Sequence, residues 1–380
     1  KKINDMYGHD QGDEVIGLIA QHLQQMLPVD HFLCRRSGDE FIAVLNIHEP
    51  VADFQAKLKL IFKPAVFSIQ HGGAVQITAT FSAGAALFPD HSQSIDELLI
   101  YADTALLTAK ESGRNQIKWL NTKMMKDNTR KIKVESKLAD AIRDDRIFPH
   151  YQPEVDLQTG KIIGFEALAR WHDEELGMVS PAEFIPLAED SGLILPLGQW
   201  VLRTACEQLA RWAKEPGREQ LTLAVNVSGR QLHQKNFVEQ VLQALQQTGA
   251  PAHRLKLELT ESLLLDDPED AITKMSALKA HGVGFSLDDF GTGYSSLAYL
   301  RQLPLSQLKI DQSFVHNLVT DPRATAIVRT IVTLADSLGL NVIAEGVETQ
   351  EQREHLARNG CHTCQGYLYG RPGPVEELMR

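Results

Sequence analysis

The pattern of hydrophobic and polar positions divides the chain into two regions with different rhythms. Before about residue 120, apolar positions with helical spacing around Val15 precede strand-like runs at 41–45 and 75–81 and a second helical pattern at 98–110. After about residue 134, short strand-like runs alternate with helical segments. The pattern therefore predicts a small α/β unit followed by a larger one.

The larger region predicts a (β/α)8 barrel of the TIM type. Its eight candidate strands are 148–155, 162–170, 221–227, 255–259, 283–288, 307–310, 341–345 and 363–367. Helix-start signals lie between strands, as where the capping Ser180 precedes Pro181 and Glu183. Further predicted helix caps are Asp267, Asp321 and Thr349. A doubly wound open sheet is the alternative, but no glycine-rich phosphate-binding turn follows the first strand.

A polar, basic stretch from Asn121 to Lys133 separates the two regions, and we expect it to be a helical linker. The predicted organisation is a partial α/β domain at 1–120, the linker at 121–133 and a barrel domain at 134–380. The first residue is Lys1, which indicates a piece of a longer protein. No apolar run is long enough to span a bilayer. Because so few cysteines favour a reducing compartment, we expect a cytoplasmic catalytic region, with membrane attachment only through an upstream segment.

Composition narrows the function classes. The 380 residues include 43% hydrophobic and 23% charged side chains, as in ordinary globular proteins. The formal net charge of −11 disfavours binding to a nucleic-acid polymer. Four cysteines are too few for a disulfide framework, and the single CxxC pair Cys361 and Cys364 is better interpreted as two incidental thiols than as a zinc site.

Most candidate strands of the barrel region end in an acid, an amide or a lysine. These residues are Glu166, Asn226, Glu258, Asp288, Asp289, Lys309, Glu345 and Gln365. Barrel enzymes carry their catalytic groups at the carboxyl ends of the strands, so we expect these side chains to converge. Two carboxylates about 4 Å apart repel by roughly 4 kcal/mol at an effective dielectric near 20, so the cluster requires cations. Oxygen ligands without His or Cys favour Mg²⁺ or Mn²⁺ over Zn²⁺.

Two features of this cluster point to phosphate chemistry. The adjacent Asp288 and Asp289 suit two bridged metal ions, an arrangement that cleaves phosphodiesters. Arg170 shares a strand face with Glu166 and suits a phosphate oxygen. Supporting acids are expected at Glu261, Asp311 and Glu348, and the segment 290–297 is expected to form a loop beside the metals.

At these residues the chain resembles the EAL-domain cyclic di-GMP phosphodiesterases. The ordered motifs are YQPEVDL (151–157), EALAR (166–170), NVS (226–228), ELTES (258–262), LDDFGTGYSSL (287–297), KIDQSFV (309–315), AEGVET (344–349) and QGYLYGRP (365–372). The resemblance implies a barrel that hydrolyses cyclic di-GMP to linear pGpG with two Mg²⁺ or Mn²⁺ ions.

The resemblance also implies a role for each matching residue. The implied metal ligands are Glu166, Asn226, Glu258, Asp288, Asp289 and Glu345. The implied catalytic group consists of Lys309 and Glu345 around the attacking water, Gln365 as a polar contact, Glu348 as a supporting acid and Glu261 as the anchor of the flexible loop. The implied substrate contacts are Gln152, Leu168 and Arg170.

The first region resembles a GGDEF domain, the diguanylate cyclase fold, without its beginning. The motifs are KKINDMYGHDQGD (1–13), RRSGDEF (35–41) and AKESGRN (109–115). The implied contacts are Asn4, Asp13, Lys110 and Arg114 for GTP and Asp39 for a metal. The strand that carries the other metal-binding Asp of this fold is not in the chain, and Ser37 replaces the first signature glycine. We therefore expect a regulatory unit rather than a working cyclase.

Other functions stay open at this point. The chain could be a receptor that holds cyclic di-GMP without cleaving it, a barrel enzyme that abstracts protons with Mg²⁺ and Lys309, or part of a bifunctional cyclase and phosphodiesterase. The complete set of expected ligands argues against the receptor, and the paired aspartates argue against the proton-abstracting enzyme. A homodimer through barrel surfaces beside the 291–297 loop is also expected.

Overall fold

The structure, a computed structural model, describes residues 2–28, 30–61, 64–70, 74–261, 263, 267–291 and 300–379. The chain divides into two compact units, Lys1–Ile132 and Lys133–Arg380. The division falls within helix α5 (Thr122–Arg143), so the segment predicted as a linker belongs to a longer helix. Among the described residues, no helix combines the length and the apolar character that a bilayer span requires.

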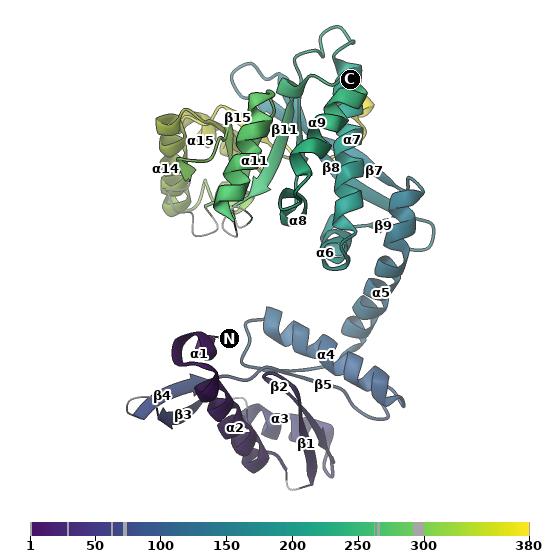
Figure 1. The fold of residues 1–380 in the computed structure, drawn as a ribbon, viewed down its shortest axis with the longest axis vertical. Helices are drawn as coiled ribbons and strands as arrows, with labels where there is room; N and C mark the ends of the chain where they lie inside the picture. The colour runs from purple at the N-terminus through teal and green to yellow at the C-terminus, as the bar shows by residue number, and fades with distance from the viewer. Residues whose placement is uncertain are drawn as a thin grey trace. The chain divides into compact units, whose positions relative to one another are not determined.

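The N-terminal unit combines helices with two-stranded sheets (Figure 1). Its helices are α1 (Lys2–Tyr7), α2 (His9–Met26), α3 (Val51–Ile61) and α4 (Ile95–Glu111). Its strands pair as β1 (His31–Ser37) with β2 (Glu40–Leu45), β3 (Ala65–Gln70) with β4 (Ala74–Ala79), and β5 (Ala83–Ala85) with β6 (Ile117–Trp119). The strands β1, β3, β5 and β6 were not predicted. β5 and β6 have three residues each, and β1 shows no clean alternation of buried and exposed residues.

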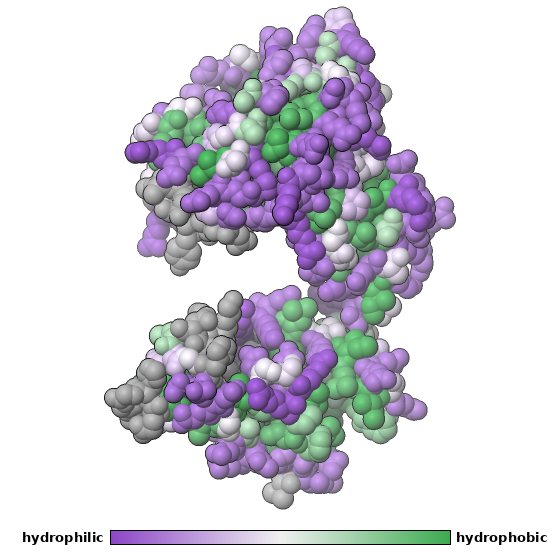
Figure 2. All heavy atoms as spheres, viewed as in Figure 1, coloured by the Kyte–Doolittle hydropathy of each residue, from purple (hydrophilic) through white to green (hydrophobic). Residues whose placement is uncertain are grey.

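The described part of the N-terminal unit has small cores. One is formed by Val15, Ile69 and Ile77, and another by Phe54 and Leu58. Large apolar side chains remain exposed in this unit, as Figure 2 illustrates; examples are Phe32, Val44, Phe88 and Ile95. Most of the burial in the chain therefore lies in the second unit.

The C-terminal unit is a closed barrel, as predicted. Around it the strands are β7 (Ile147–Asp156), β8 (Ile162–Asp173), β10 (Thr222–Asn226), β11 (Leu255–Thr260), β12 (Gly284–Phe290), β13 (Gln307–Ile310), β14 (Asn341–Ala344) and β15 (Thr363–Gln365). Pairing of β15 with β7 and of β8 with β10 closes the circle, and β9 (Gly177–Val179) pairs antiparallel with the end of β8.

The expectation of a helix after every strand is wrong for the first strand. β7 runs antiparallel to both β8 and β15, and a tight turn joins it to β8. Asp156 accepts hydrogen bonds from the backbone N–H groups of Gln158 and Thr159, and Gly160 adopts a φ of 68°. So few residues separate the two strands that only a hairpin can join them, since a parallel crossover needs a dozen or more.

The described helices of this unit are, in chain order, α6 (Pro181–Ser191), α7 (Ile194–Trp212), α8 (Gly229–Leu232), α9 (Phe237–Thr248), α11 (Pro268–Ala280), α13 (Gln312–His316), α14 (Pro322–Leu338), α15 (Gln350–Arg358) and α16 (Val375–Leu378). The predicted caps are confirmed. Ser180 and Thr349 form capping boxes, and Asp267 and Asp321 accept bonds from the first turns of their helices. Each cap satisfies N–H groups that a helix start leaves unpaired.

The barrel strands carry apolar side chains on one face and polar side chains on the other. Buried apolar residues such as Phe165, Leu223 and Phe285 belong to the main hydrophobic cluster, together with residues of the covering helices. The alternate positions carry buried polar groups, which are Gln152, Glu154, Glu166, Glu258, Ser286, Gln307, Lys309 and Gln365. Because strand side chains alternate between two faces, these polar groups line the inside of the barrel.

Candidate active site

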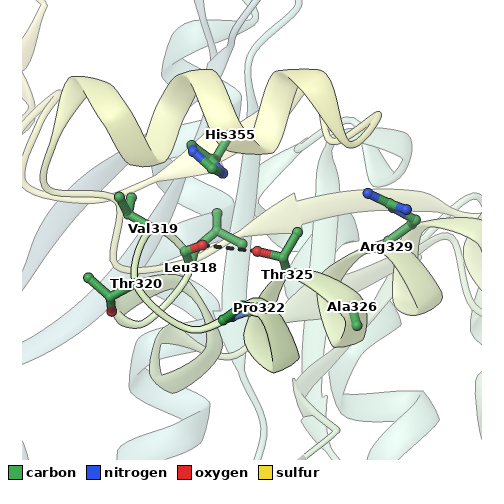
Figure 3. Close-up of a pocket in the computed structure, with 8 residues that line it drawn as sticks. All are labelled: Leu318, Val319, Thr320, Pro322, Thr325, Ala326, Arg329 and His355. Carbon is green, nitrogen blue, oxygen red and sulfur yellow. Dashed lines mark hydrogen bonds between the residues drawn. The ribbon is translucent and has the colours of Figure 1, made fainter.

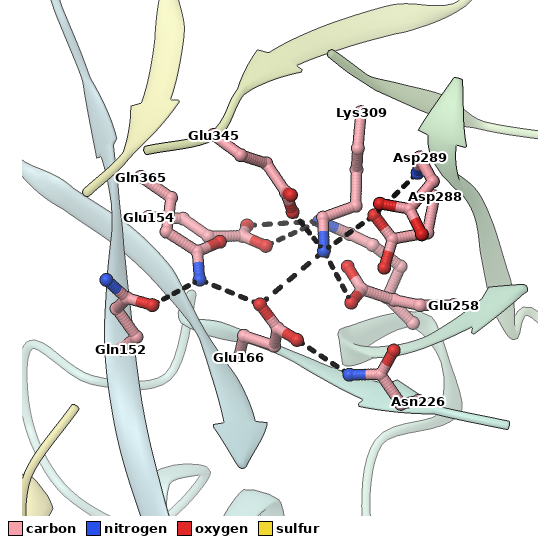
Figure 4. Close-up of polar contacts among 11 residues, drawn as sticks. Gln152, Glu154, Glu166, Asn226, Glu258, Asp288, Asp289, Lys309, Glu345 and Gln365 are labelled. Carbon is pink, nitrogen blue, oxygen red and sulfur yellow. Dashed lines mark hydrogen bonds and ion pairs between the residues drawn. The ribbon is translucent and has the colours of Figure 1, made fainter. Parts of the chain in front are cut away.

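The residues predicted to converge do so inside the barrel, toward the carboxyl ends of its parallel strands (Figure 4). Glu166 comes from β8, Glu258 from β11, Asp288 and Asp289 from β12, and Lys309 from β13. Asn226 ends β10, Glu345 follows β14 and Gln365 ends β15. The side chains of one site therefore come from strands spread over most of the barrel.

Lys309 lies at the centre of this cluster and is 1% exposed. Its Nζ lies 2.6 Å from Oε1 of Glu345 and 2.7 Å from Oε2 of Glu258. The same nitrogen lies 3.4 Å from Oδ1 of Asp288 and 3.5 Å from Oε2 of Glu166. One buried ammonium group thus faces four carboxyl groups.

Glu166 is held by amides on both sides. The Nδ2 of Asn226 donates to Oε1 at 2.6 Å, and the Nε2 of Gln365 donates to Oε2 at 2.7 Å. Gln365 also donates to Oε1 of Gln152 at 2.9 Å. These bonds orient the plane of the Glu166 carboxylate.

Burial and mutual repulsion dominate the electrostatics of the cluster. Burial raises the pKa of Glu345 to about 8 and raises the pKa of Glu258 well above its usual range. Burial also opposes ionisation of Glu166, but Lys309 and the two amides outweigh it and lower the pKa of this carboxyl. A single lysine cannot neutralise all these acids, so the site favours additional positive charge.

The two adjacent aspartates reach the same region because of an irregularity in β12. Successive strand residues normally point to opposite faces. Here the pairing of β12 with β13 shifts between Leu287 and Phe290, and Asp289 adopts a φ of 54°. One carboxylate oxygen each from Asp288, Asp289 and Glu345 therefore lie within 4.8 Å of one another. The sequence predicted that these carboxylates lie close together, but it did not predict the bulge that brings them there.

These residues fit hard divalent cations. The donors are carboxylate and amide oxygens, which Mg²⁺ and Mn²⁺ prefer. The Oε1 of Glu258 is buried and has no hydrogen-bond partner in the described part of the chain. A buried acceptor without a donor is costly, and a cation would satisfy it.

The predicted substrate contacts lie at the edge of this cluster. Arg170 is half-buried, donates from Nη1 to the carbonyl of Ala169 at 2.9 Å, and follows Glu166 on the same strand face. Burial lowers the pKa of its guanidinium. Leu168 lies between them on that face and is also half-buried, whereas Gln152 is buried beside Gln365.

The predicted supporting acids differ in their surroundings. Glu261 is buried, and neither carboxylate oxygen has a hydrogen-bond partner among the residues described here. The loop it was expected to anchor, 292–297, lies outside the described residues. Glu348 is half-exposed, with Oε1 3.9 Å from Nε2 of His316. Asp311 caps α13 by accepting from the backbone N–H of Ser313. The roles of Glu261 and Glu348 stay predictions.

Three of the GTP contacts predicted in the N-terminal unit lie on its surface. Asp13 is exposed on α2, Lys110 is exposed in the last turn of α4, and Arg114 is exposed beyond that helix with a φ of 59°. The side chain of Asn4 lies outside the described residues. The nucleotide site of this unit therefore stays a prediction.

Sequence analysis missed one charged pair inside the barrel. Glu154 is 1% exposed, and its carboxylate is paired with Lys256. The available signal was spacing, because Glu154 follows Gln152 at the two-residue interval that places both on one strand face.

Two other features do not belong to this site. A hollow of about 420 Å³ lies beside α14 and contains none of the residues discussed above (Figure 3); it is lined by Leu318, Val319, Thr320, Pro322, Thr325, Ala326, Arg329 and His355. Cys361 and Cys364 are buried free thiols, and burial raises the pKa of each to about 12. Protonated thiols are poor metal ligands.

Two known families match the two regions of the chain. The family described as "EAL domain" matches residues 135–372, and "Diguanylate cyclase, GGDEF domain" matches residues 1–116. The chain is 40% identical to the "Bifunctional diguanylate cyclase/cyclic di-GMP phosphodiesterase MucR" of Pseudomonas aeruginosa over 100% of this chain and 55% of the relative. It is 38% identical to the "Cyclic di-GMP phosphodiesterase NbdA" of the same species over 100% of this chain and 48% of the relative. The chain thus spans about half the length of these curated relatives.

Solved structures place the barrel unit in the same family. The structure titled "PaMucR Phosphodiesterase, c-di-GMP complex" is 43% identical, with a TM-score of 0.63, over 65% of this chain and 99% of that one. The EAL domain of Mycobacterium smegmatis DcpA is 38% identical, with a TM-score of 0.52, over 60% of this chain and 92% of that one. The chain belongs to the family of proteins in which a GGDEF domain precedes an EAL domain.

Proposed function

We propose that this chain hydrolyses one phosphodiester bond of cyclic di-GMP and releases linear pGpG, using Mg²⁺ or Mn²⁺. The observation that carries the proposal is the convergence of Glu166, Glu258, Asp288 and Glu345 around Lys309 inside the barrel. The names of MucR and NbdA and the cyclic di-GMP complex of a similar EAL domain support it.

Two groups of residues would hold the ions. The first ion would bind Glu166, Asn226, Glu258 and Asp288, and the second would bind Asp288 and Asp289, with Glu345 nearby. Bound at this site, the ions would lower the pKa of water and neutralise charge on the phosphate.

The protein groups would perform the remaining steps. Arg170 would bind a phosphate oxygen of the substrate, while Gln152 and Leu168 contact it nearby. Lys309 would orient the water, and the Glu345 carboxylate would accept its proton. The water oxygen then bonds to phosphorus, the bond from phosphorus to the 3′ oxygen breaks, and the leaving oxygen takes up a proton. This yields a 5′ phosphate and a 3′ hydroxyl.

The test is turnover of cyclic di-GMP followed by chromatography, with and without Mg²⁺ or Mn²⁺. We expect pGpG only with the metal. Glu166→Ala and Glu345→Ala should each lower the rate at least about a hundredfold while the fold survives. Glu207→Ala, an exposed acid on α7, is the matched control and should retain the wild-type rate. Binding of cyclic di-GMP without pGpG from folded, metal-loaded protein would contradict the proposal and indicate a receptor.

For the N-terminal unit we propose regulation by GTP through Asp13, Lys110 and Arg114. The match of residues 1–116 to the GGDEF family supports this role. In the full-length protein, GTP should change the rate or the KM of the phosphodiesterase, and Arg114→Ala should remove the change. An identical rate with and without GTP would refute the regulation but leave the barrel activity untouched.

We also propose that the barrel unit forms a homodimer. The expected surface is the one beside the 291–297 loop, and the support is the sequence resemblance alone. Sedimentation across a range of protein concentrations tests it, and a constant monomer mass would exclude the dimer.

A further inference from the structure

A second buried ion pair crosses the inside of the barrel. The Nζ of Lys256 lies 3.0 Å from Oε2 and 3.3 Å from Oε1 of Glu154. Glu154 is 1% exposed, and the side chain of Lys256 is 13% exposed. β7 pairs with β8 and β15, whereas β11 pairs with β10 and β12. Because the two strands are not neighbours, the bond must pass through the barrel interior.

This pair lies one layer of side chains beneath the proposed metal ligands. Lys256 precedes Glu258 by two residues on β11, so both side chains point inward. On the opposite side, Gln152 lies across from Glu166, and Glu154 lies across from Gly164. Inward side chains of a barrel stack in such layers, so the pair is adjacent to the acid cluster.

Gly164 leaves room for the Glu154 side chain. A Cβ at Gly164 would lie 3.2 Å from Oε2 of Glu154 and 2.2 Å from Oγ1 of Thr222. A Cβ at Gly284 would lie 3.8 Å from Cγ of Lys256 and 3.3 Å from Oγ of Ser306. A side chain at Gly164 would therefore crowd the Glu154 carboxylate, whereas the distance at Gly284 is an ordinary van der Waals contact with Lys256.

The charges of Glu154 and Lys256 affect the electrostatic potential at the proposed metal ligands. After burial and nearer charges, the carboxylate of Glu154 is among the causes that raise the pKa of Glu258. Two charges in a water-excluded interior interact far more strongly than at a surface. An unpaired charge at either position would therefore change the potential at the metal ligands.

We propose that Glu154 and Lys256 are positioning residues that keep the charge beneath the metal ligands neutral and so set the affinity of the site for divalent cations. The inference rests on the proposed function, because it assumes that the acid cluster binds metal. Alone, Lys256 would repel a cation, and alone, Glu154 would attract one. The two single neutralisations must therefore act in opposite directions, which a purely structural role would not produce.

The test measures Mn²⁺ binding to metal-free full chain by calorimetry and by the electron paramagnetic resonance signal of free Mn²⁺. Glu154→Gln should weaken binding by about fivefold or more, and Lys256→Gln should tighten it by a similar factor. The charge-swapped double variant, Glu154→Lys with Lys256→Glu, should return within about twofold of the wild type.

A matched pair outside the barrel interior serves as the control. Asp173 is a buried acid paired with Lys137, near the turn between β8 and β9. Asp173→Asn and Lys137→Gln should leave the Mn²⁺ affinity unchanged, even where they lower the Tm. A change as large as that in the barrel variants would overturn the inference.

Three further outcomes would also overturn it. The single variants could keep the wild-type affinity, they could both weaken binding along with the Tm, or the folded charge-swapped variant could lose more than about tenfold in affinity. Where a single variant fails to fold, the Mn²⁺ affinity of the charge-swapped variant tests the inference. Absence of Mn²⁺ binding in the wild type would instead overturn the proposed function together with the inference.

Discussion

At the scale of single residues, Lys309 determines the state of the acid cluster without metal. It lies within 3.5 Å of four carboxyl groups but supplies only one positive charge. The acids that remain uncompensated are stabilised by protons, as the raised pKa values of Glu258 and Glu345 indicate. Metal ions would therefore compete with protons for the same oxygens.

This competition predicts a pH dependence. With a pKa raised to about 8, Glu345 holds its proton at neutral pH in the metal-free protein and loses it when a cation binds. Mn²⁺ binding near pH 7 should thus release protons, and the affinity should rise as the pH increases through about 8. Calorimetry in buffers of different ionisation enthalpy measures the release. Equal heats in all buffers would contradict it.

At the scale of elements, the bulge in β12 brings two acids to one side of the strand. Asp289 has a φ of 54°, a region that Asp and Asn tolerate but β-branched residues avoid. Burial and the neighbouring Asp288 and Asp311 raise the pKa of its carboxyl, so ionisation at this position is unfavourable without metal. The positive φ and the charge of Asp289 therefore place a carboxylate in the acid cluster, but both lower the stability of the fold.

Two substitutions at Asp289 distinguish the effect of its charge from the effect of its backbone conformation. In metal-free protein, Asp289→Asn should be at least as stable as the wild type, because it removes the repulsion and keeps a side chain that suits the backbone. Asp289→Val should be less stable than Asp289→Asn by about 1–2 kcal/mol. Urea unfolding compares the two. Equal stability would mean that the bulge imposes no backbone preference.

Helix α6 offers a simpler test of local sequence signals. Ser180 and Glu183 form a reciprocal capping box, and Phe184 packs in the cluster that contains Trp171. Ser180→Ala should lower the free energy of unfolding by about 1 kcal/mol, since N–H groups of the first turn lose their acceptor. Thermal unfolding measures this loss, and Ser112→Ala, at the end of α4 in the other unit, is the control.

At the scale of the whole molecule, helix α5 contributes to the core of the barrel unit. Its buried residues Val134, Leu138 and Ala141 belong to the same hydrophobic cluster as Trp171 and Phe184. Burial of a Val or Leu side chain contributes about 1.5–3 kcal/mol, so the second half of α5 is part of the barrel domain.

Truncation tests this assignment. A fragment of residues 121–380 should fold and hydrolyse cyclic di-GMP, whereas a fragment of 145–380 should be less stable by several kcal/mol because it exposes the surface that α5 covers. Urea unfolding of both fragments gives the difference. If the shorter fragment matched the longer one in stability, the contribution of α5 would be negligible.

Much of the architecture was predictable because local chemistry repeats. The caps at Ser180, Asp267, Asp321 and Thr349 and the strand ranges predicted for the barrel agree closely with the structure. These signals depend on neighbours within a few residues, which is why a single sequence contains them. The antiparallel direction of β7 was missed because the repeating strand–helix pattern obscured a short hairpin turn.

The amino-acid sequence by itself determined which side chains of a regular strand share a face, since a strand alternates its faces at every residue. The motifs likewise identified the acids of the cluster. Only the tertiary structure decided which of those side chains meet. Three features depend on how strands that are distant in the chain close into a barrel. They are the bond between Glu154 and Lys256, the four acidic neighbours of Lys309 and the bulge at Asp289. The physical reason is that alternation specifies a face, whereas distances across the barrel depend on register and closure.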